Sequence, residues 1–296
     1  MKISIIGTNG FLSVAMAKYC NEQKWDLDMY GLDAPKGHKY NHFYQINLLS
    51  DKIDYSEMLK SDIIIYASGA GIQSNLHESA YIVYALNVTV PVNLCDDLKV
   101  NGYKGIFVSF GSVFEMGQTK EQRSFTEEDI ITSLCEAPND YAVSKRMLTR
   151  FISSYKHEFI HWHFIIPTIY GEKENPLRLI PYTINAIKNN DELHFTAGDQ
   201  TRQYIYVNEV PRLIHLAVNK KLPNGIYNIE GKETLTVKEI VTLIHHCMGK
   251  SVPTNCFGTV QRADVGMKFL ALNGNKLKEA TGFEAKTKIK DIINKY

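Results

Sequence analysis

Tyr141 and Lys145 are the residues whose types and spacing most directly predict chemistry. They lie four positions apart, and on a helix this spacing places both side chains on one face. A phenol is a poor base near neutral pH, but a nearby ammonium group favours the phenolate and lowers the pKa of the tyrosine. The pair therefore predicts acid–base chemistry on a hydroxyl or carbonyl oxygen.

A glycine-containing turn follows the first apolar run of the chain. Residues 3–6 are typical of a buried strand, and Gly7, Thr8, Asn9, Gly10, Phe11 and Leu12 lead from it towards a helical stretch at residues 14–20. Glycines permit a tight turn and a close approach of the backbone, and the N–H groups of a helix N-terminus favour a pyrophosphate. Residues 7–12 are therefore predicted to bind a dinucleotide, whose nicotinamide would exchange hydride while Tyr141 and Lys145 exchange the proton.

Asp33 ends the second expected strand, directly after Gly31 and Leu32. A carboxylate at this place can accept hydrogen bonds from the ribose hydroxyls of the adenosine, and it repels a 2′-phosphate. The prediction is therefore NAD(H). Lys36 and Lys39 follow closely, and either can neutralise a phosphate, so NADP(H) stays open as the alternative.

Short β-rich runs alternate with longer helical stretches over the first half of the chain. Strands are expected at residues 3–6, 28–32, 63–67, 106–110 and 163–167, and the helices between them include residues 78–98 and 141–155. This alternation is typical of βαβ units, and apolar runs without a clean polar alternation indicate strands covered on both faces. The sequence therefore predicts an α/β protein with a Rossmann-type, doubly wound parallel sheet.

The pattern changes after residue 167. A helix is expected over residues 176–188 and a strand over 203–207, with no repeat and no Pro/Ser-rich linker between the two halves. The later part is therefore expected to fold back onto the first. We predict a cofactor-binding domain over residues 1–167, with a returning segment near 203–230. A smaller, mostly C-terminal α/β substrate-binding domain is predicted over residues 168–202 and 231–296.

The composition argues against several classes of partner. The 33 Lys and Arg residues balance 32 Asp and Glu residues, a net charge of +1, which argues against electrostatic binding of nucleic acid or of an acidic membrane surface. The apolar runs are far shorter than the roughly 20 residues that span a bilayer. The five cysteines show no C-x-x-C spacing, so neither a disulfide framework nor a zinc site is expected. These features predict a cytoplasmic protein without a bound metal.

Taken together, these motifs resemble those of the extended short-chain dehydrogenase/reductases, specifically the NAD-dependent epimerase/dehydratase family that acts on nucleotide sugars. The resemblance covers nearly the whole chain. It is carried by Gly7-x-x-Gly10, Asp33, the strand at 62–68, Asn87-Val88-x-x-x-x-Asn93-Leu94, Val113-Phe114, Tyr141-x-x-x-Lys145, the segment at 167–171 and the segment at 198–207 with Arg202. It implies NAD(H) or NADP(H) as the cofactor, a nucleoside diphosphate sugar as the substrate, and a homodimer formed by the helices at 78–98 and 141–155.

The resemblance also implies which residues contact the two ligands. Cofactor contacts are implied for Asn47, Leu48, Ala67, Ser68, Asn87 and Pro167, in addition to residues 7–12, Asp33, Tyr141 and Lys145. Arg202 and Arg262 are implied to bind the diphosphate of the sugar nucleotide, since planar guanidinium groups form paired bonds to phosphate oxygens. Asn175 and Arg178 fall where the substrate loop and helix of the family lie, with a structural role as the alternative.

One position departs from the family pattern. The family has Ser or Thr three residues before the Val of its Val-Tyr-Gly motif, where this chain has Phe110. Because side chains alternate along a strand, Ser112 shares a face with residue 110. We therefore predict that Ser112 supplies the catalytic hydroxyl beside Tyr141, with Ser109 as the second choice. A family dehydratase resembles Thr-Asp-Glu at positions 110–112, and both carboxylates are absent here, so 4,6-dehydration is not expected.

The expected activity is the NAD(P)-dependent reduction of a nucleoside diphosphate 4-keto-6-deoxyhexose at C4, for a surface polysaccharide. Two alternatives stay open. One is a nucleotide-sugar 4-epimerase that keeps its NAD, and the other is a non-catalytic NAD(P)-binding regulatory protein on the same fold. The altered segment at 109–112 and the compact chain favour the reductase over the epimerase. Tyr141 and Lys145 argue against the regulator, whereas Phe110 argues for it.

Overall fold

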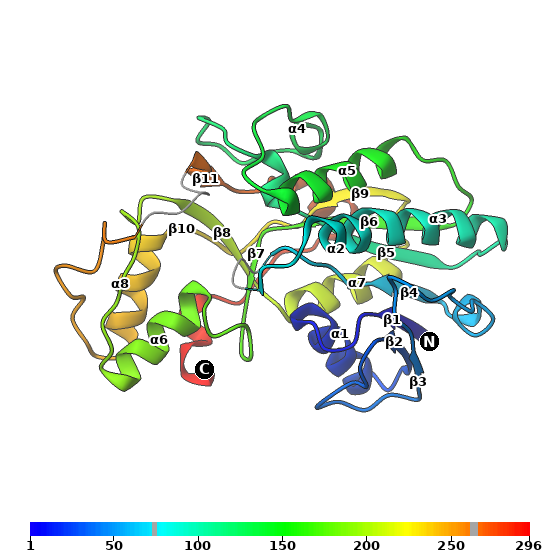
Figure 1. Cartoon of the computed structure of the whole chain (residues 1–296), viewed down its shortest axis with the longest axis horizontal. Coiled ribbons are helices and arrows are strands. Elements are labelled where there is room, and N and C mark those ends of the chain that lie inside the picture. Colours follow the sequence, from blue (N-terminus) through cyan, green and yellow to red (C-terminus); the bar gives the residue numbers. More distant parts are fainter. Residues whose placement is uncertain (73–75, 261–265) are drawn as a thin grey trace.

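A parallel sheet of seven strands forms the larger lobe, and a second sheet of four strands runs into a smaller lobe (Figure 1). The computed structural model describes residues 1–72, 76–260 and 266–296. In sheet order, the seven strands are β3 (His42–Gln45), β2 (Asp26–Gly31), β1 (Lys2–Ile6), β4 (Ile63–Tyr66), β5 (Ile106–Ser112), β6 (Ile160–Ile166) and β9 (Gly225–Asn228). The direction of winding reverses between β1 and β4, the place where doubly wound sheets bind ligands. The predicted Rossmann-type sheet is confirmed.

Helices cover both faces of the seven-stranded sheet. One face carries α1 (Phe11–Glu22), α7 (Glu209–Asn219) and α9 (Asn275–Thr281), and the other carries α2 (Ala80–Tyr84), α3 (Val90–Val100) and α5 (Asp140–Ser154). Ile63 and Ile65 of β4 pack toward α1 and α7, whereas Ile64 and Tyr66 pack toward α3. Both faces of the strand are therefore buried, which explains why its sequence is apolar without alternation.

The helix expected over residues 78–98 contains a π-helical turn, η3 (Ala85–Thr89), between α2 and α3. Here the N–H of Val90 donates to the carbonyl of Ala85, five residues back. Pro91 has no N–H to donate to the carbonyl of Asn87, so the α-helical bonding pattern cannot pass through this turn unbroken. The turn contains Asn87, whose side chain is completely buried, and π turns inside helices are frequent at functional sites.

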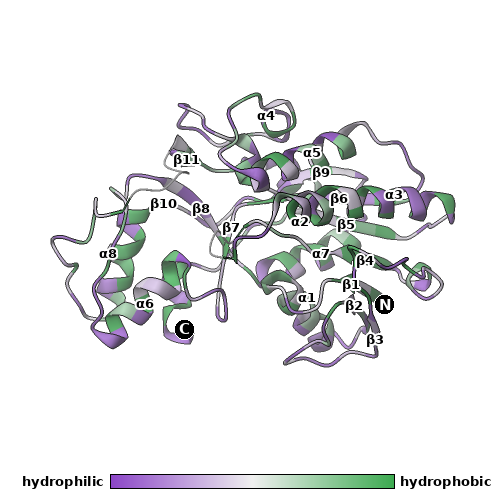
Figure 2. Cartoon of the chain, viewed as in Figure 1, coloured by the Kyte–Doolittle hydropathy of each residue, from purple (hydrophilic) through white to green (hydrophobic). Residues whose placement is uncertain are grey.

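The second sheet is centred on β8 (Thr201–Tyr206). This strand pairs in parallel with β7 (Thr168–Tyr170) and β11 (Phe269–Leu270) and in antiparallel fashion with β10 (Glu233–Thr236). In the smaller lobe, α6 (Leu179–Asn189) and α8 (Val237–Cys247) share one apolar cluster, and Figure 2 shows hydrophobic stretches on both helices. After β8 the chain returns to the large sheet through α7 and β9.

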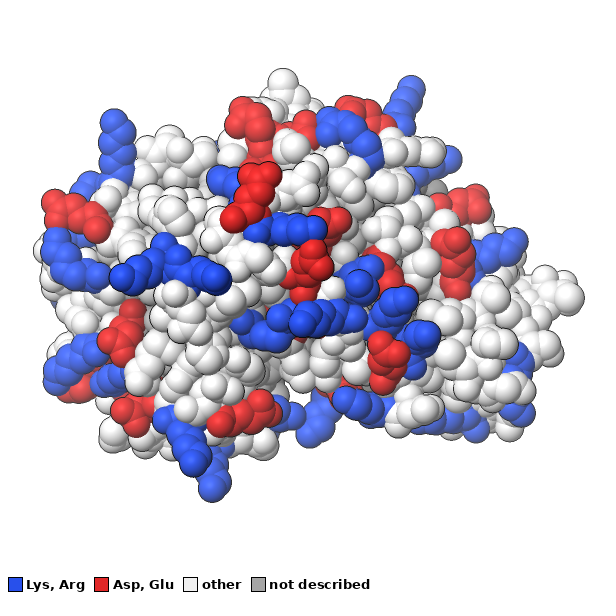
Figure 3. All heavy atoms as spheres, turned by 180° about the vertical axis from the view of Figure 1, so that it is seen from behind, with Lys and Arg blue, Asp and Glu red and all other residues white. Residues whose placement is uncertain are grey.

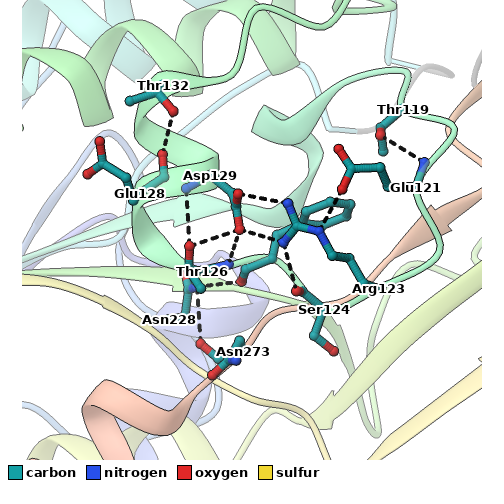
Figure 4. A network of polar contacts seen from close by, with 11 residues as sticks. Thr119, Glu121, Arg123, Ser124, Thr126, Glu128, Asp129, Thr132, Asn228 and Asn273 are labelled. Carbon is teal, nitrogen blue, oxygen red and sulfur yellow. Dashed lines mark hydrogen bonds and ion pairs between the residues drawn. The ribbon is translucent and has the colours of Figure 1, made fainter.

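Short helical turns complete the chain. They are η1 (Met58–Lys60), η4 (Val113–Met116), α4 (Glu127–Thr132), η6 (Ile289–Asp291) and η7 (Ile293–Lys295). The segment around α4, which leads to α5, is held by the polar network in Figure 4. Arg123 donates two hydrogen bonds to Asp129, at 2.7 and 2.9 Å, and Asn228 of β9 donates to the carbonyl of Phe125 at 2.9 Å. The segment is thereby anchored to the edge of the large sheet.

The surface carries both signs of charge. On the face shown in Figure 3, Lys and Arg side chains lie among Asp and Glu side chains, in keeping with the net charge of +1. Across residues 1–72, 76–260 and 266–296, none of the helices has both the length and the apolar content needed to cross a bilayer.

Candidate functional site

The carboxyl end of β5 meets the first turns of α5 and brings three predicted residues together. Asn139 caps α5 by accepting a hydrogen bond from the N–H of Ala142 at 3.0 Å, which places Tyr141 in the first turn. The Lys145 Nζ atom lies 6.0 Å from the centre of the Tyr141 ring. At the end of β5, the Ser112 hydroxyl acts on the Tyr141 phenol and lowers its pKa. Tyr141, Lys145 and Ser112 therefore form one group.

Burial controls the charge of this group. It raises the pKa of Tyr141 to about 12, against the opposing effects of the Ser112 hydroxyl and the Arg178 guanidinium. It also lowers the pKa of Lys145 to about 8, and the Glu115 carboxylate acts in the opposite direction. The sequence predicts a lowered pKa for this phenol; the pKa is raised instead, because desolvation of the phenol is the largest effect on it. Tyr141 is therefore protonated at neutral pH and suited to donate a proton.

Ser109 is not brought to the phenol. Its Oγ atom is completely buried and lies 2.8 Å from His161 Nε2 and 2.7 Å from His163 Nδ1. Ser109 and Ser112 are three residues apart on one strand, so their side chains leave it on opposite faces. Ser109, the second choice, thus faces His161 and His163 and not Tyr141. In the described part of the chain, no group of three or more His, Cys, Asp or Glu residues is arranged to hold a metal ion.

Glu115 belongs to the site but was not anticipated from the sequence. Its side chain is completely buried, and one carboxylate oxygen accepts a hydrogen bond from the N–H of Ser112 at 2.6 Å. Burial raises the pKa of this carboxyl to about 7. The signal was visible in the sequence, since Glu115 stands where the family motif has glycine.

The predicted phosphate-binding turn has the shape that a dinucleotide requires. Gly7 has a φ of +106°, and a Cβ atom there would lie 2.8 Å from Ser68 Oγ and 3.1 Å from the carbonyl carbon of Ala67. Gly10 caps α1 without any side-chain hydrogen bond to the first turn. The turn therefore leaves the N–H groups of the helix N-terminus available to a pyrophosphate. The residues present fit the expected cofactor.

The other residues of this turn support its position. Thr8 packs against Gly31, where a Cβ atom would lie 2.8 Å from its methyl group. Phe11 and Leu12, at the start of α1, pack against the apolar cluster shared by α6 and α8. The turn is therefore in contact with both β2 and the smaller lobe.

Asp33 lies at the end of the crevice predicted to hold the adenosine. It is exposed and makes no hydrogen bond or ion pair with another described residue. Asn9 holds the loop that follows it, donating to the carbonyl of Ala34 at 3.1 Å and accepting from the N–H of Lys36 at 3.0 Å. The Asp33 carboxylate is therefore available to ribose hydroxyls, while Lys36 and Lys39 are exposed nearby.

Asn87 has a structural role in addition to the predicted one. Its Oδ1 atom accepts a hydrogen bond from the N–H of Ala70 at 3.0 Å, and its Nδ2 atom donates to the carbonyl of Ala70 and to the Ser144 hydroxyl, both at 2.9 Å. The side chain thus ties the loop after β4 to α5. This loop begins with Ala67 and Ser68, which pack against Gly7.

Three further cofactor candidates lie near the crevice. The Oδ1 atom of Asn47 accepts the N–H of Leu49 at 3.0 Å, so its side chain closes a turn. Leu48 lines a cavity of about 460 Å³ between this turn and α3. Pro167 is buried between β6 and β7.

Two of the predicted substrate residues come from the second sheet and the smaller lobe. Arg202 of β8 is buried, and its guanidinium group lies 5.8 Å from the centre of the Phe114 ring. Arg178, at the start of α6, forms an ion pair with Glu174 at 3.3 Å. Burial raises the pKa of Tyr204 to about 12, and both arginines oppose this rise. The two guanidinium groups are therefore close to Tyr204, and Arg178 also acts on Tyr141.

The remaining two substrate candidates are Asn175 and Arg262. The Oδ1 atom of Asn175 accepts a hydrogen bond from the N–H of Leu177 at 2.9 Å in the loop before α6. Arg262 lies outside the described residues.

Comparisons with known proteins agree with this geometry. Residues 3–229 match the model of the "NAD dependent epimerase/dehydratase family". A dTDP-D-glucose 4,6-dehydratase of Dictyostelium discoideum is 26% identical over 63% of this chain and 45% of its own length. A CDP-abequose synthase of Salmonella muenchen is 28% identical over 53% of this chain and 50% of its own length. The chain thus spans about half the length of these curated relatives.

Solved structures match over almost the whole chain. MoeE5 in complex with UDP-glucuronic acid and NAD has a TM-score of 0.83 at 16% identity, covering 99% of this chain and 97% of its own. A UDP-glucose 4-epimerase of Thermotoga maritima with UDP-glucose has a TM-score of 0.83 at 17% identity, covering 99% and 96%. At these identities the likeness shows the fold. Together with the match of the family model, it shows that the chain belongs to the NAD-dependent epimerase/dehydratase family, in agreement with the cofactor expected from the glycine turn.

Proposed function

We propose that this protein is an NAD(P)-dependent reductase of a nucleoside diphosphate 4-keto-6-deoxyhexose, acting at C4 in the synthesis of a surface polysaccharide sugar. The observation that carries the proposal is the placement of Tyr141 and Lys145 on one helix, with the Lys145 Nζ atom 6.0 Å from the centre of the Tyr141 ring and Ser112 acting on the phenol from the carboxyl end of β5. Reduction of a ketone requires a proton donor at the developing alkoxide, and a partly buried phenol with a raised pKa meets this need.

Each residue of the group has a distinct role in this proposal. Tyr141 donates its proton to the sugar oxygen, and the Ser112 hydroxyl polarises the same oxygen. Lys145, anchored by a hydrogen bond from its Nζ atom to the carbonyl of Phe110 at 2.9 Å, carries the positive charge that stabilises the phenolate left behind. The ionisation that the buried phenol resists on its own thus becomes favourable as the proton leaves.

The cofactor and the sugar nucleotide are assigned to opposite sides of this group. Gly7, Gly10 and the N-terminus of α1 would hold the pyrophosphate of NAD, and Asp33 its ribose hydroxyls. NAD(P)H, when bound, supplies the hydride for the sugar carbon. Arg178 and Arg202 would bind the diphosphate of the substrate with paired charge-assisted hydrogen bonds.

Dehydration is disfavoured by the residues at the end of β5. Positions 110–112 are Phe, Gly and Ser, and the nearby carboxylate of Glu115 is completely buried and bonded to the Ser112 N–H. It is therefore not offered to a substrate as an acid or base. Among the curated relatives, the name CDP-abequose synthase supports synthesis of a nucleoside diphosphate sugar.

A 4-epimerase is the second candidate, because the same Tyr141, Ser112 and Lys145 group can serve oxidation and reduction at one carbon. The fold shared with a UDP-glucose 4-epimerase supports the epimerase as the second candidate. The two reactions differ in cofactor use, since an epimerase returns its NAD unchanged while a reductase consumes NAD(P)H.

The test is incubation of the protein with nucleotide sugars and 4-keto sugars in the presence of NADH or NADPH. Loss of reduced-nicotinamide absorbance with a keto sugar, together with a product heavier by two hydrogens, supports the reductase. Formation of an isomer without net cofactor change supports the epimerase. A protein that binds cofactor but turns over no sugar contradicts both and favours the regulator. The Tyr141→Phe variant is the matched control.

We also propose a homodimer formed through α2, α3 and α5. Tyr81 and Met147 are exposed large side chains on these helices, 69% and 48% accessible, and such side chains are the kind that association buries. Light scattering on the purified protein should give twice the mass of one chain, and a monomer mass would contradict the proposal.

A further inference from the structure

Glu115 is a buried carboxylate held from several sides directly behind the catalytic group. Its Oε1 atom accepts the Ser112 N–H at 2.6 Å. The Arg146 guanidinium donates to the backbone carbonyl of Glu115 through Nε at 2.8 Å and Nη2 at 2.6 Å. The position of this carboxylate is therefore fixed relative to Ser112 and to α5, the helix that carries Tyr141 and Lys145.

A chain of buried polar side chains leads away from this carboxylate. The Thr149 hydroxyl lies 2.9 Å from His163 Nε2, borders the same space at Gly111 as Glu115 Oε1, and lowers the pKa of the Glu115 carboxyl. His163 Nδ1 lies 2.7 Å from the Ser109 hydroxyl, which in turn lies 2.8 Å from His161 Nε2. All four side chains are completely or almost completely buried.

The donors in this chain can be assigned from the number of protons available. Burial lowers the pKa of both His161 and His163, so each imidazole is neutral and carries one N–H. If the Thr149 hydroxyl donates to the carboxylate of Glu115, Thr149 must accept from His163 Nε2. Ser109 must then donate to His163 Nδ1 and accept from His161 Nε2. Each group in this chain then donates its hydrogen bond to the next group in the direction of Glu115. This arrangement orients an ionised carboxylate.

Gly111 provides the space in which these groups meet. A Cβ atom at this position would lie 2.5 Å from Glu115 Oε1, 2.8 Å from His163 Nε2 and 3.2 Å from Thr149 Oγ1. Any side chain on residue 111 would therefore displace the carboxylate. The absence of a side chain at Gly111 therefore leaves the space that the carboxylate of Glu115 occupies.

We propose that Glu115 is a positioning residue for the proton-transfer group: its carboxylate fixes Ser112 at the end of β5 and places a negative charge near Lys145, while the chain from Thr149 to His161 orients that carboxylate. This inference rests on the proposed function for its catalytic consequence. Its electrostatic part concerns Lys145 itself and can be measured without a substrate.

Charges on several elements act on this pair. Burial raises the pKa of Glu115, and Thr149, the Ser112 N–H, Lys145 and Arg146 each lower it. Burial lowers the pKa of Lys145 to about 8, and Glu115 raises it. On β6, the neutral His163 is the group that faces both. Removing the charge of Glu115 must therefore move the titration of Lys145 to lower pH.

The direct test is the titration of Lys145 in protein labelled with [13Cε]lysine. The resonance of Lys145 is identified by its loss in Lys145→Arg. In Glu115→Gln its midpoint should fall by about 1–3 pH units, the scale for loss of a neighbouring opposite charge. Glu209→Gln is the matched control: Glu209 is also buried and accepts backbone N–H bonds, from Lys286 and Thr287, and its loss should leave the midpoint unchanged. An unchanged midpoint in Glu115→Gln would overturn the inference.

A second variant covers the case in which Glu115→Gln does not fold. Thr149→Val removes a hydrogen bond that stabilises the ionised carboxylate, so Glu115 becomes more neutral and the Lys145 midpoint should again move to lower pH. A Thr149→Val protein with the wild-type midpoint counts against the inference.

Activity measurements then test the catalytic consequence. With an active substrate, Glu115→Gln should lower kcat about tenfold or more near pH 8 while KM changes by less than about threefold, and the alkaline limb of the kcat profile should move to lower pH. A wild-type pH profile in Glu115→Gln would refute the catalytic part. If the wild-type protein turns over no sugar at all, the proposed function fails, and the Lys145 titration still decides whether Glu115 sets the charge of Lys145.

Discussion

The glycine turn at residues 7–12 and the group around Tyr141, to which we assign cofactor binding and proton transfer, are built in different ways. The turn is contiguous in sequence, and its critical features are a positive φ at Gly7 and the backbone N–H groups of α1. The Tyr141 group draws on β5, η4, α5 and β6 and depends on buried polar side chains.

This difference predicts different ways of failing. A backbone site fails when a side chain occupies the space reserved for the ligand or strains the turn, because its binding groups belong to every residue type. A buried polar group loses its function when one charge or hydrogen-bond partner is removed. The remaining groups are then desolvated without a partner that compensates for the cost. Mutations in the two regions should therefore separate binding, stability and turnover.

The largest effect is expected at the phenol. Tyr141→Phe removes the transferable proton and should lower turnover by about 100-fold or more, with sugar affinity largely retained. Lys145→Ala should be at least as harmful, since it removes the charge that stabilises the phenolate. Steady-state kinetics measures the loss, and calorimetry of NAD(H) binding to Tyr141→Phe is the control, where affinity should be near wild type. Full activity of Tyr141→Phe would remove the catalytic assignment.

The stability of the buried group should depend on pH in a predictable direction. The folded pKa of Glu115 is raised from 4.5 to about 7, so between these values the folded state binds more protons than the unfolded state. Its contribution to stability is then complete below about pH 4.5 and is lost as the pH rises through 7. Denaturant unfolding of the wild type, compared with Glu115→Gln, should show this loss, on the order of 2–3 kcal/mol. Parallel plots of the free energy of unfolding against pH for the wild type and Glu115→Gln would contradict this prediction.

In the turn, the two glycines should respond differently to the same substitution. Gly7→Ala places a methyl group 2.8 Å from Ser68 Oγ at a φ of +106°, so we expect a loss of stability of about 1–3 kcal/mol and of NAD(H) binding. Gly10 has a φ of −67°, and the nearest atom to its added Cβ is 3.4 Å away. Gly10→Ala should therefore weaken NAD(H) binding with little loss of stability. Equal destabilisation by the two would show that the strain at Gly7 is misassigned.

The smallest effect is expected at Asp33. Asp33→Ala removes the acceptor for the ribose hydroxyls and the charge that repels a 2′-phosphate, so the preference for NAD(H) over NADP(H) should narrow by about 1–2 kcal/mol. Calorimetric titration with both cofactors measures the gap, and Lys36→Ala is the exposed control nearby. Tighter binding of NADP(H) by the wild type would reverse the assignment in favour of Lys36 or Lys39.

The sequence by itself determined the features whose physical causes lie within a few residues of one another. The tight turn at Gly7 needs a residue without a Cβ atom, the carboxylate of Asp33 follows directly from the end of a strand, and the spacing of Tyr141 and Lys145 is a property of any α-helix. The apolar runs of β4 and β5, which lack a clean polar alternation, likewise implied a sheet covered on both faces, and this was sufficient for the parallel fold.

Only the tertiary structure decided the properties that depend on which distant groups surround a side chain. The choice of Ser112 over Ser109 follows from the two faces of β5, one toward Tyr141 and the other toward His161 and His163. The pKa of Tyr141 rises and does not fall, because desolvation of the phenol, which depends on the surrounding fold, is the largest effect on it. Glu115 gains its role because Ser112, Thr149 and Arg146 converge on it from separate elements, a non-local arrangement that no spacing along the chain encodes.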